Sequence, residues 1–486
     1  MRADTVTRLR LASKRSRRSK ERGMALVMVL LSIVVLTVFL TEVQQESSAS
    51  FASAVAARER LKAEYAAKSG VNLTRLLIAT EPTVRQMIGP GLQLMMAATG
   101  GKPGNPPQIP VWEFAAELLA PYNCSERHQS FSDLAGVDLS SAEGIGMGDD
   151  ICFDIVTVDE DALINVNMAA RFDPISRNLL AKQLVSLMQG PQFDTIFQSE
   201  DADGQFTDRQ GLCSAIIDWA DYDEDAEPCN PFAETAPTSS GGEDNIYQSL
   251  GLGYFRKNAA FDSLEELRLV RGMRDEIWQS FVDPDPQDPK KRIITVWGQG
   301  RVNVNSANAQ TALAIICADA VQQDGGLCQD PVQQATFIQT VQLFKAFVPG
   351  IPLFSSPADF KSMFSGKGLV GTQMAALGIQ PVQFRGDIDR LIDTKSKTFS
   401  IYSEGLARSA GRETRVNVHA VLDYRNATEI SQLPVPQAAG AAGAGGALGA
   451  QAGQTGSGGS GAAAPMDLMS ALASNPAGQM IYYRME

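Results

Sequence analysis

The pattern of apolar positions begins with one long helix. An apolar run from Met24 to Leu40 is broken only by Ser32 and Thr37. As a helix this run is about 25 Å long, which is the short limit for spanning a bilayer. Between residues 44 and 78 apolar side chains recur at near-helical spacing. The pattern therefore predicts that the same helix continues beyond the membrane as a spine.

Further along the chain, strand-like and helical patterns form separate blocks. Period-two alternation typical of strands occurs at 152–158, 163–167, 293–297, 301–305, 399–402 and 415–422. Helical spacing with turn-rich acidic loops fills 170–285, and more helix is expected up to about residue 392. Because strand segments bracket the helical block, the pattern predicts an α+β fold, in which a small antiparallel sheet carries a large inserted all-helical domain.

These patterns divide the chain into nine segments. They are a leader at 1–23, a transmembrane and spine helix at 24–78, the first part of an α/β domain at 79–170, a helical insertion at 171–290, a strand return at 291–305, a helical part at 306–394, terminal strands at 395–430, a Gly/Ala-rich linker at 431–465 and a tail at 466–486. The linker has the composition of a flexible connection. The pattern assigns no role to the tail.

Charge separates the N-terminus from the rest of the chain. The 486 residues carry a formal net charge of −13. The first 23 residues run the other way, with nine Lys or Arg against Asp4 and Glu21. An acidic body repels phosphate backbones, so no nucleic-acid partner is expected, and the basic tract is interpreted as a sorting signal. The 44% apolar content suits a globular protein with a large core.

Three interpretations of the N-terminus compete. A secretory signal peptide requires a small-x-small cleavage site after the apolar run, and residues 41–45 contain none. A signal anchor explains the basic flank, because positive charge stays in the cytoplasm while the C-terminal side crosses the inner membrane. That interpretation gives no role to Gly23. The third one does, because a basic leader that ends in Gly directly before an apolar helix resembles the type IV prepilin signal.

The prepilin resemblance implies processing by the prepilin peptidase. In that family the peptidase cuts after this Gly and the new N-terminus is methylated, so cleavage between Gly23 and Met24 is expected. A long helix followed by a small sheet is also similar to the type IV pilin-like fold. Most pilins and pseudopilins carry Glu at the fifth mature position, which is Met28 here. A buried ammonium without a partner is costly, so this subunit is expected to occupy the filament tip.

Six cysteines, at 124, 152, 213, 229, 317 and 328, follow the membrane segment. On the translocated side of the membrane oxidation is expected, and the even count predicts disulfides. Pairing 124 with 152, 213 with 229 and 317 with 328 is the simplest arrangement, and the others stay open. No CxxC pair is present, so neither a zinc site nor thioredoxin-like chemistry is expected.

Alternating carboxylates gather in one predicted loop. Asp221, Asp223 and Asp225 are the type of oxygen ligand that calcium prefers. The loop is not an EF-hand, because Ala226 stands where that motif needs Gly and Phe232 where it needs Glu. A solvated acidic loop without metal is the alternative.

Residues 261–273 are similar to a helix-hairpin-helix, with Gly272 in the left-handed position between the helices. In DNA-binding relatives of that hairpin the amides of the turn hold a phosphate. The acidic surroundings favour a hairpin that serves packing alone. A membrane-anchored DNA-binding protein, as in natural competence, is the alternative function.

The ordered set of motifs resembles the minor pseudopilins of the K class from type II secretion systems, the general secretion pathway protein K family. The motifs lie at 22–26, 66–70, 164–167, 217–225, 243–247, 261–273 and 302–307. The resemblance implies a pilin-like domain with an inserted helical domain, and a calcium site for which the candidate ligands are Asp221, Asp223, Asp225, Glu243 and Asp244.

The same resemblance implies a single-pass inner-membrane protein with a cytoplasmic N-terminus and a periplasmic body. The expected partners are the other minor pseudopilins, of the I and J classes, and the pseudopilus whose tip this subunit caps to support export across the outer membrane. No enzymatic activity is expected, because no nucleophile, base or metal triad accompanies the motifs. His128 and His419, the two histidines, are interpreted as structural or exposed.

Overall fold

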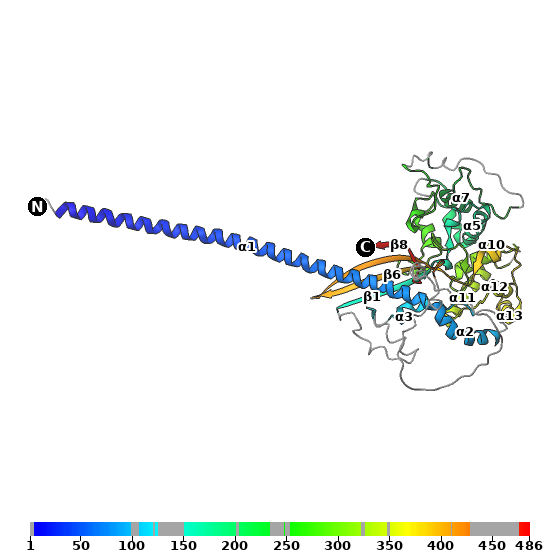
Figure 1. The fold of residues 1–486 in the computed structure, drawn as a ribbon. Coiled ribbons are helices and arrows are strands. Elements are labelled where there is room, and N and C mark those ends of the chain that lie inside the picture. The colour runs from blue at the N-terminus through cyan, green and yellow to red at the C-terminus, as the bar shows by residue number, and fades with distance from the viewer. Residues whose placement is uncertain are drawn as a thin grey trace, which may run out of the picture.

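A computed structural model places one long helix as a rod beside a compact body (Figure 1). It describes residues 4–98, 106–119, 122–124, 150–200, 204–233, 247, 253–321, 326–347, 350–409, 411–427 and 476–486, with backbone alone at 4–23, 95–98 and 369–370. All statements below on the fold refer to these residues. Helices, 3-10 turns and strands carry the labels α, η and β.

The rod is helix α1 (Asp4–Ala79), which runs through 76 residues without interruption. Its apolar side chains between Met24 and Leu40 are 51–68% exposed, and this end of the rod projects away from the body (Figure 1). In the described part of the chain, α1 is the one helix long and apolar enough to cross a membrane. The predicted membrane and spine segments are therefore one element.

A four-stranded antiparallel sheet lies against the other end of the rod, in the order β1-β6-β7-β8. Its strands are β1 (Ile151–Asp159), β6 (Thr398–Ser409), β7 (Arg412–Asp423) and β8 (Gln479–Met485). The first three contain the alternating segments that predicted them. The fourth comes from the tail, to which the sequence pattern assigned no role, and it forms an edge of the sheet by pairing with β7.

Small residues let the spine and the sheet approach closely. Ala63, Ala67 and Gly70 of α1 are fully or almost fully buried against the sheet. A Cβ atom added to Gly405 of β6 would lie 2.0 Å from the carbonyl oxygen of Ala63. One added to Gly70 would lie 2.4 Å from Ser403 Oγ. Gly70 therefore does not break the spine but allows β6 to pack against it.

The remainder of the body is mostly helical and consists of two units. The first unit (residues 164–295) contains β2 (Ile164–Asn165), η5 (Val166–Met168), α5 (Pro174–Leu187), η6 (Pro191–Phe193), α6 (Asp194–Phe197), α7 (Arg209–Ala220), η7 (Leu264–Leu269), α9 (Asp275–Ile277), the π-helical turn η8 (Trp278–Val282), η9 (Pro289–Lys291) and β3 (Ile294–Thr295). The second unit (302–393) contains β4 (Val302–Asn303), α10 (Ala309–Asp319), α11 (Pro331–Phe347), α12 (Pro357–Phe364), α13 (Gly368–Ala376), α14 (Ile388–Leu391) and β5 (Ile392–Asp393). In chain order, α2 (Glu81–Ala98), η1 (Val111–Phe114) and α3 (Ala115–Leu118) follow the spine and precede β1, and η4 (Glu160–Ala162) follows β1.

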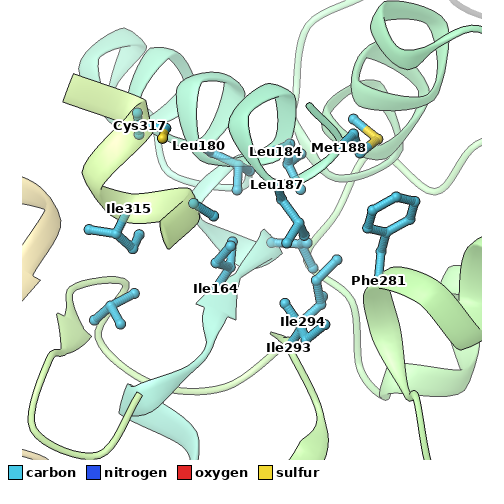
Figure 2. Close-up of a cluster of buried hydrophobic side chains, with 14 of the residues drawn as sticks. Ile164, Leu180, Leu184, Leu187, Met188, Phe281, Ile293, Ile294, Ile315 and Cys317 are labelled. Carbon is cyan, nitrogen blue, oxygen red and sulfur yellow. The ribbon is translucent and has the colours of Figure 1, made fainter. Parts of the chain in front are cut away.

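The two units share one hydrophobic core. Leu180 and Leu184 of α5 point toward Ile164 of β2 and toward Ile315 of α10 (Figure 2). Phe281 closes the same cluster from η8 (Figure 2). The helical segments that were predicted separately at 171–290 and 306–394 are therefore packed together. A second, smaller core joins the spine to the sheet.

Each unit closes on itself through a short parallel strand pair. β2 pairs with β3, and β4 pairs with β5. Longer strands were expected at 163–167 and 301–305, but each supplies only two residues and neither joins the main sheet. The reason is a local turn, because Asn165 Oδ1 accepts a hydrogen bond from the Asn167 amide and Asn303 Oδ1 accepts one from the Asn305 amide, which ends the strand.

Three disulfides staple the body. Cys124 pairs with Cys152, Cys213 with Cys229 and Cys317 with Cys328, at Cα–Cα distances of 5.1, 6.0 and 5.5 Å. This confirms the simplest predicted connectivity. The first disulfide fixes the segment before the sheet to β1, and each of the other two closes a loop within one helical unit.

Candidate functional site

The predicted processing site lies on the free part of the rod. Gly23 belongs to the portion of α1 that is described by backbone alone, and Met24 follows it without a break in the helix. Met24 is 65% exposed and Met28, at the fifth position of the expected mature chain, is 68% exposed. Both side chains thus face whatever surrounds the rod.

The acidic loop begins where α7 ends. Arg177 of α5 reaches across to it, and its Nη1 donates a hydrogen bond to Asp221 Oδ2 at 2.9 Å and a second, short one to Asp223 Oδ2. The Asp225 amide donates to Asp223 Oδ1 at 3.2 Å. Two of the predicted metal ligands are therefore held together by a guanidinium, and the third approaches through its backbone.

Burial changes the chemistry of the carboxylates in this loop. It raises the pKa of Asp218 to about 7 and that of Asp221 to about 6, although hydrogen bonds from Glu227 N and Ser214 Oγ to Asp218 act in the opposite direction. Asp221 is 2% exposed, and its Oδ1 atom is buried without a hydrogen-bond partner. A buried carboxylate oxygen without a donor favours a cation beside it.

The described residues offer only part of a metal site. No group of three or more His, Cys, Asp or Glu among them is arranged to hold a metal ion. Glu243 and Asp244, the other two candidate ligands, lie outside the described residues. The residues that fit a cation are thus Asp221, through its unpaired Oδ1, and Asp223 beside it.

The hairpin at 261–273 is a packing element. Its first helix is a 3-10 helix, η7, and Gly272 adopts φ +84° as expected. A Cβ atom on Gly272 would lie 2.5 Å from Thr207 Cγ2, so the turn is covered by another segment. The amide of Arg271 donates to the Tyr247 hydroxyl at 3.2 Å. The turn therefore faces protein rather than presenting its amides to a phosphate.

Sequence reasoning missed a cluster of buried acids at the joint between the sheet and the first unit. Glu160 is 0% exposed, and its Oε1 forms an ion pair with Arg292 Nη2 at 2.8 Å. Thr295 and Ser400 hydroxyls donate further short hydrogen bonds to the same carboxylate. The carboxylate thus connects β3 of the first unit to β6 of the sheet. Three consecutive acids directly after an alternating strand were the available signal.

The two acids beside Glu160 hold the backbone at the same joint. Asp161 accepts hydrogen bonds from the amides of Gln299, Lys397 and Thr398 at 2.7–3.0 Å. Asp159 accepts one from Ser396 Oγ, and burial raises its pKa to about 8. The chain segments that leave both helical units therefore converge on one acidic tripeptide.

Comparison with known proteins finds a family match that covers most of the first helical unit. Residues 162–282, most of the first unit, match the family model described as type II secretion system (T2SS), protein K. A chain from the crystal structure of the GspK-GspI-GspJ complex from enterotoxigenic Escherichia coli Type 2 Secretion System aligns with 70% of this chain and 94% of its own length, at 13% identity and a TM-score of 0.35. No curated protein matches the chain.

Proposed function

We propose that the chain is a minor pseudopilin that caps the tip of a pseudopilus and supports protein export across the outer membrane, because residues 162–282 match the family model of type II secretion system protein K. The family match carries this proposal. The free apolar end of α1 agrees with it, since a pseudopilin is held by such a helix.

The rod anchors the protein in the inner membrane in this proposal. An apolar, unpacked α1 is compatible with a single membrane crossing. The basic tract before Met24 keeps the N-terminus in the cytoplasm and places the body in the periplasm. Three disulfides in the body suit that oxidising compartment.

Prepilin peptidase removes the leader between Gly23 and Met24. Mass spectrometry of the purified protein is expected to find a chain that starts at methylated Met24. Replacing Gly23 by Leu is expected to leave the leader attached, whereas replacing Ser32 by Leu, inside the apolar run, leaves processing intact. A wild-type chain that retains residues 1–23 would contradict this step.

The tip position follows from Met28 and from the bulk of the body. Without a carboxylate at the fifth mature position, the helix offers nothing to neutralise the ammonium of a subunit above it. The two helical units lie at the end of α1 away from its apolar half, where they would obstruct a subunit stacked on top (Figure 1). The partners proposed are minor pseudopilins of the I and J classes, which dock below.

Immunogold labelling of purified filaments tests the tip position. Label at one end, at one copy per filament, is the expected result, together with a stoichiometric complex of this chain and the two smaller minor pseudopilins. Label along the whole filament would refute it.

We also propose that the acidic loop binds calcium through Asp221 and Asp223, with Asp225, Glu243 and Asp244 as further candidate ligands. The unpaired Asp221 Oδ1 supports this proposal. An ion at a hundred times its Kd stabilises the native state by about 2.7 kcal/mol, so calcium is expected to raise the melting temperature relative to chelator. Asp223→Asn is expected to remove most of that rise, and Asp275→Asn, an exposed aspartate 77% accessible, to retain it. Equal melting in calcium and chelator would contradict the site.

A further inference from the structure

A cleft of about 550 Å³ opens on the face of the sheet opposite the spine. The first unit forms one wall through Leu264, Glu265 and Trp278, and the tail strand β8 forms another through Tyr482. We call it the aromatic cleft. The cleft is not filled by the spine, which packs on the other face of the sheet, or by the Glu160 carboxylate at the joint between the sheet and the first unit.

The floor of the aromatic cleft is a set of rings from three parts of the fold. Tyr402 and His419, opposite each other on β6 and β7, stack with ring centroids 4.1 Å apart. Trp297 contacts His419 at 5.6 Å and Tyr482 at 5.3 Å. Burial lowers the pKa of His419 to about 4, so the imidazole is neutral at pH 7 and none of the four rings carries a positive charge. The Arg292 guanidinium lies over one of them, Tyr402, with its Cζ 5.7 Å from the ring centroid. Such a floor attracts a flat cation.

Acids line the cleft around that floor. Asp154, Glu265 and Asp283 line the cleft, and none of the three forms an ion pair with the described residues. Asp154 of β1 lies directly opposite Glu404 of β6, an unfavourable pairing of like charges that is relieved in part by the ion pair from Arg415 to Glu404 at 3.0 Å. Asp283 Oδ1 is buried without a hydrogen-bond partner, and burial raises the pKa of this carboxyl.

The two guanidinium groups of the cleft are already engaged elsewhere. Arg292 is buried against Glu160, as described above, and Arg484 forms an ion pair with Glu486, the residue directly after β8. In the described part of the chain, no group of three or more carboxylate, His or Cys side chains is placed to hold a metal ion. The unfilled role is that of an organic cation with a flat face and several donors.

We propose that the aromatic cleft binds an arginine side chain that a partner protein presents on an extended segment. A guanidinium stacks on aromatic rings and forms paired hydrogen bonds with a carboxylate, which fits a ring floor with acids at its rim. The charge of the cleft complements such a segment and repels an acidic one. This proposal goes beyond the tip position and does not depend on it.

The tail strand gains a role from this site. Tyr482 points to the cleft side of β8, while Tyr483, its neighbour, alternates to the spine side, where it is 42% exposed. Arg75 of the spine donates hydrogen bonds to the carbonyl oxygens of Ala477 and Gly478, which fixes the start of the strand. The residues after the Gly/Ala-rich linker thus complete the wall of the cleft.

A peptide titration tests the proposal on the full-length chain in detergent. The probe is the tripeptide acetyl-Gly-Arg-Gly-amide, followed by saturation-transfer difference NMR. We expect saturable binding, at least tenfold weaker for the citrulline analogue, which has the same shape without the charge, and several-fold weaker at high salt. The lysine analogue is expected to bind several-fold more weakly. Equal binding of the arginine and citrulline peptides, or of the arginine and lysine peptides, would overturn the assignment.

Matched variants locate the binding. Asp283→Asn is expected to weaken the arginine peptide about tenfold, whereas Asp285→Asn, two residues away and paired with Lys291 outside the cleft, leaves it unchanged. Tyr482→Ser is expected to weaken it and Tyr483→Ser to leave it unchanged. If Asp283→Asn fails to fold, Glu265→Gln takes its place. Equal effects within either pair would refute the site.

Discussion

The first and second helical units begin and end with the same arrangement of strands and turns. In each, an Asn-Val-Asn turn follows a two-residue strand, and the second Asn binds the backbone of a distant Phe through both its amide and its carbonyl. Asn167 does this to Phe261, with distances of 2.7 and 2.9 Å, and Asn305 does it to Phe354, at 2.9 and 2.9 Å. The first Asn of each turn donates a hydrogen bond to a residue three positions after the second strand of its pair. Asn165 donates to Gly298 O, after β3, and Asn303 donates to Ser396 Oγ, after β5.

The units differ in the chain that leads to that Phe. In the first unit residues 221–260 separate α7 from Phe261, and they contain the acidic loop. In the second unit only residues 348–353 separate α11 from Phe354. Loop-closure entropy grows slowly with length, so a frame held at both ends by Asn side chains tolerates the longer connection. The comparison teaches that the frame is common to both units, whereas the candidate chemistry lies in a single inserted segment.

The two units also differ in how they are held to the sheet, and the largest loss of stability is expected when this connection is removed from the first unit. The first unit is tied by the buried Glu160–Arg292 ion pair, and the second by the hydrogen bond from Asn303 to Ser396. Glu160→Ala leaves a buried guanidinium without a partner, so it is expected to lower the free energy of unfolding by about 3–5 kcal/mol in a urea titration.

The control for that variant replaces both charges. Glu160→Met combined with Arg292→Met is expected to be clearly more stable than Glu160→Ala, because no unpaired charge remains. A double variant as unstable as Glu160→Ala would show that packing, rather than charge, makes the tie.

The next largest loss of stability is expected when the disulfide of either helical unit is removed, which compares the two units directly. Cys213–Cys229 closes 16 residues at the start of the long connection, and Cys317–Cys328 closes 11 residues between α10 and α11. Replacing either pair by Ala is expected to lower the free energy of unfolding by roughly 3 kcal/mol in the chain-entropy view, with the first pair costing a few tenths more. Urea unfolding of the two variants measures this loss. A loss of stability for only one of the two variants would contradict the prediction that both disulfides stabilise the fold to a similar extent.

The Asn turns test whether the two frames are equivalent. Asn167→Ala and Asn305→Ala each leave a backbone amide and carbonyl of a Phe without their partner, so each is expected to cost about 1–3 kcal/mol, and similar amounts in the two units. Asn72→Ala, at an exposed position on the spine, serves as the control and is expected to change little. Thermal unfolding of the three variants provides the measurement.

The periodic elements of the fold could be predicted from the sequence, because their signal is local. The rod, β1, β6 and β7 lie where apolar spacing placed them, and the cysteine pairs follow from proximity along the chain. The turns at 163–167 and 301–305 were interpreted as strands because Ile-Asn-Val-Asn alternates like one. The strands end because each first Asn, Asn165 or Asn303, makes two side-chain hydrogen bonds. Its oxygen accepts from the amide two residues further on, and its NH2 group donates to a residue distant in sequence.

The sites depend on contacts between distant segments and were therefore predicted only in part. The acidic loop was found because Asp221, Asp223 and Asp225 are neighbours in sequence, but its cation Arg177 comes from another helix. Glu160 and Arg292 are 132 positions apart, and the run of three acids at 159–161 does not indicate which distant cation pairs with it. The tail strand was missed because Gln479–Met485 alternates weakly and its partner, β7, lies beyond the long linker.

The smallest expected effect concerns pH and the long connection of the first unit. Asp218 has its pKa raised by burial from an ordinary 3.8 to about 7, so the folded protein keeps this proton at pH values where the unfolded chain has already lost it. Stability from this group is therefore complete below about pH 4 and falls as pH rises toward 7, by at most about 1.4 kcal/mol per pH unit. Asp159 acts in the same direction, so the fall does not depend on Asp218 alone. Asp218→Asn, which cannot lose a proton, is expected to make the decline in urea midpoint between pH 5 and 7 shallower, whereas Asn230→Ala, exposed in the same loop, keeps the wild-type slope. If the two variants gave the same slope, the buried carboxyl of Asp218, at the end of α7 next to the long connection, would not be the source of the pH dependence.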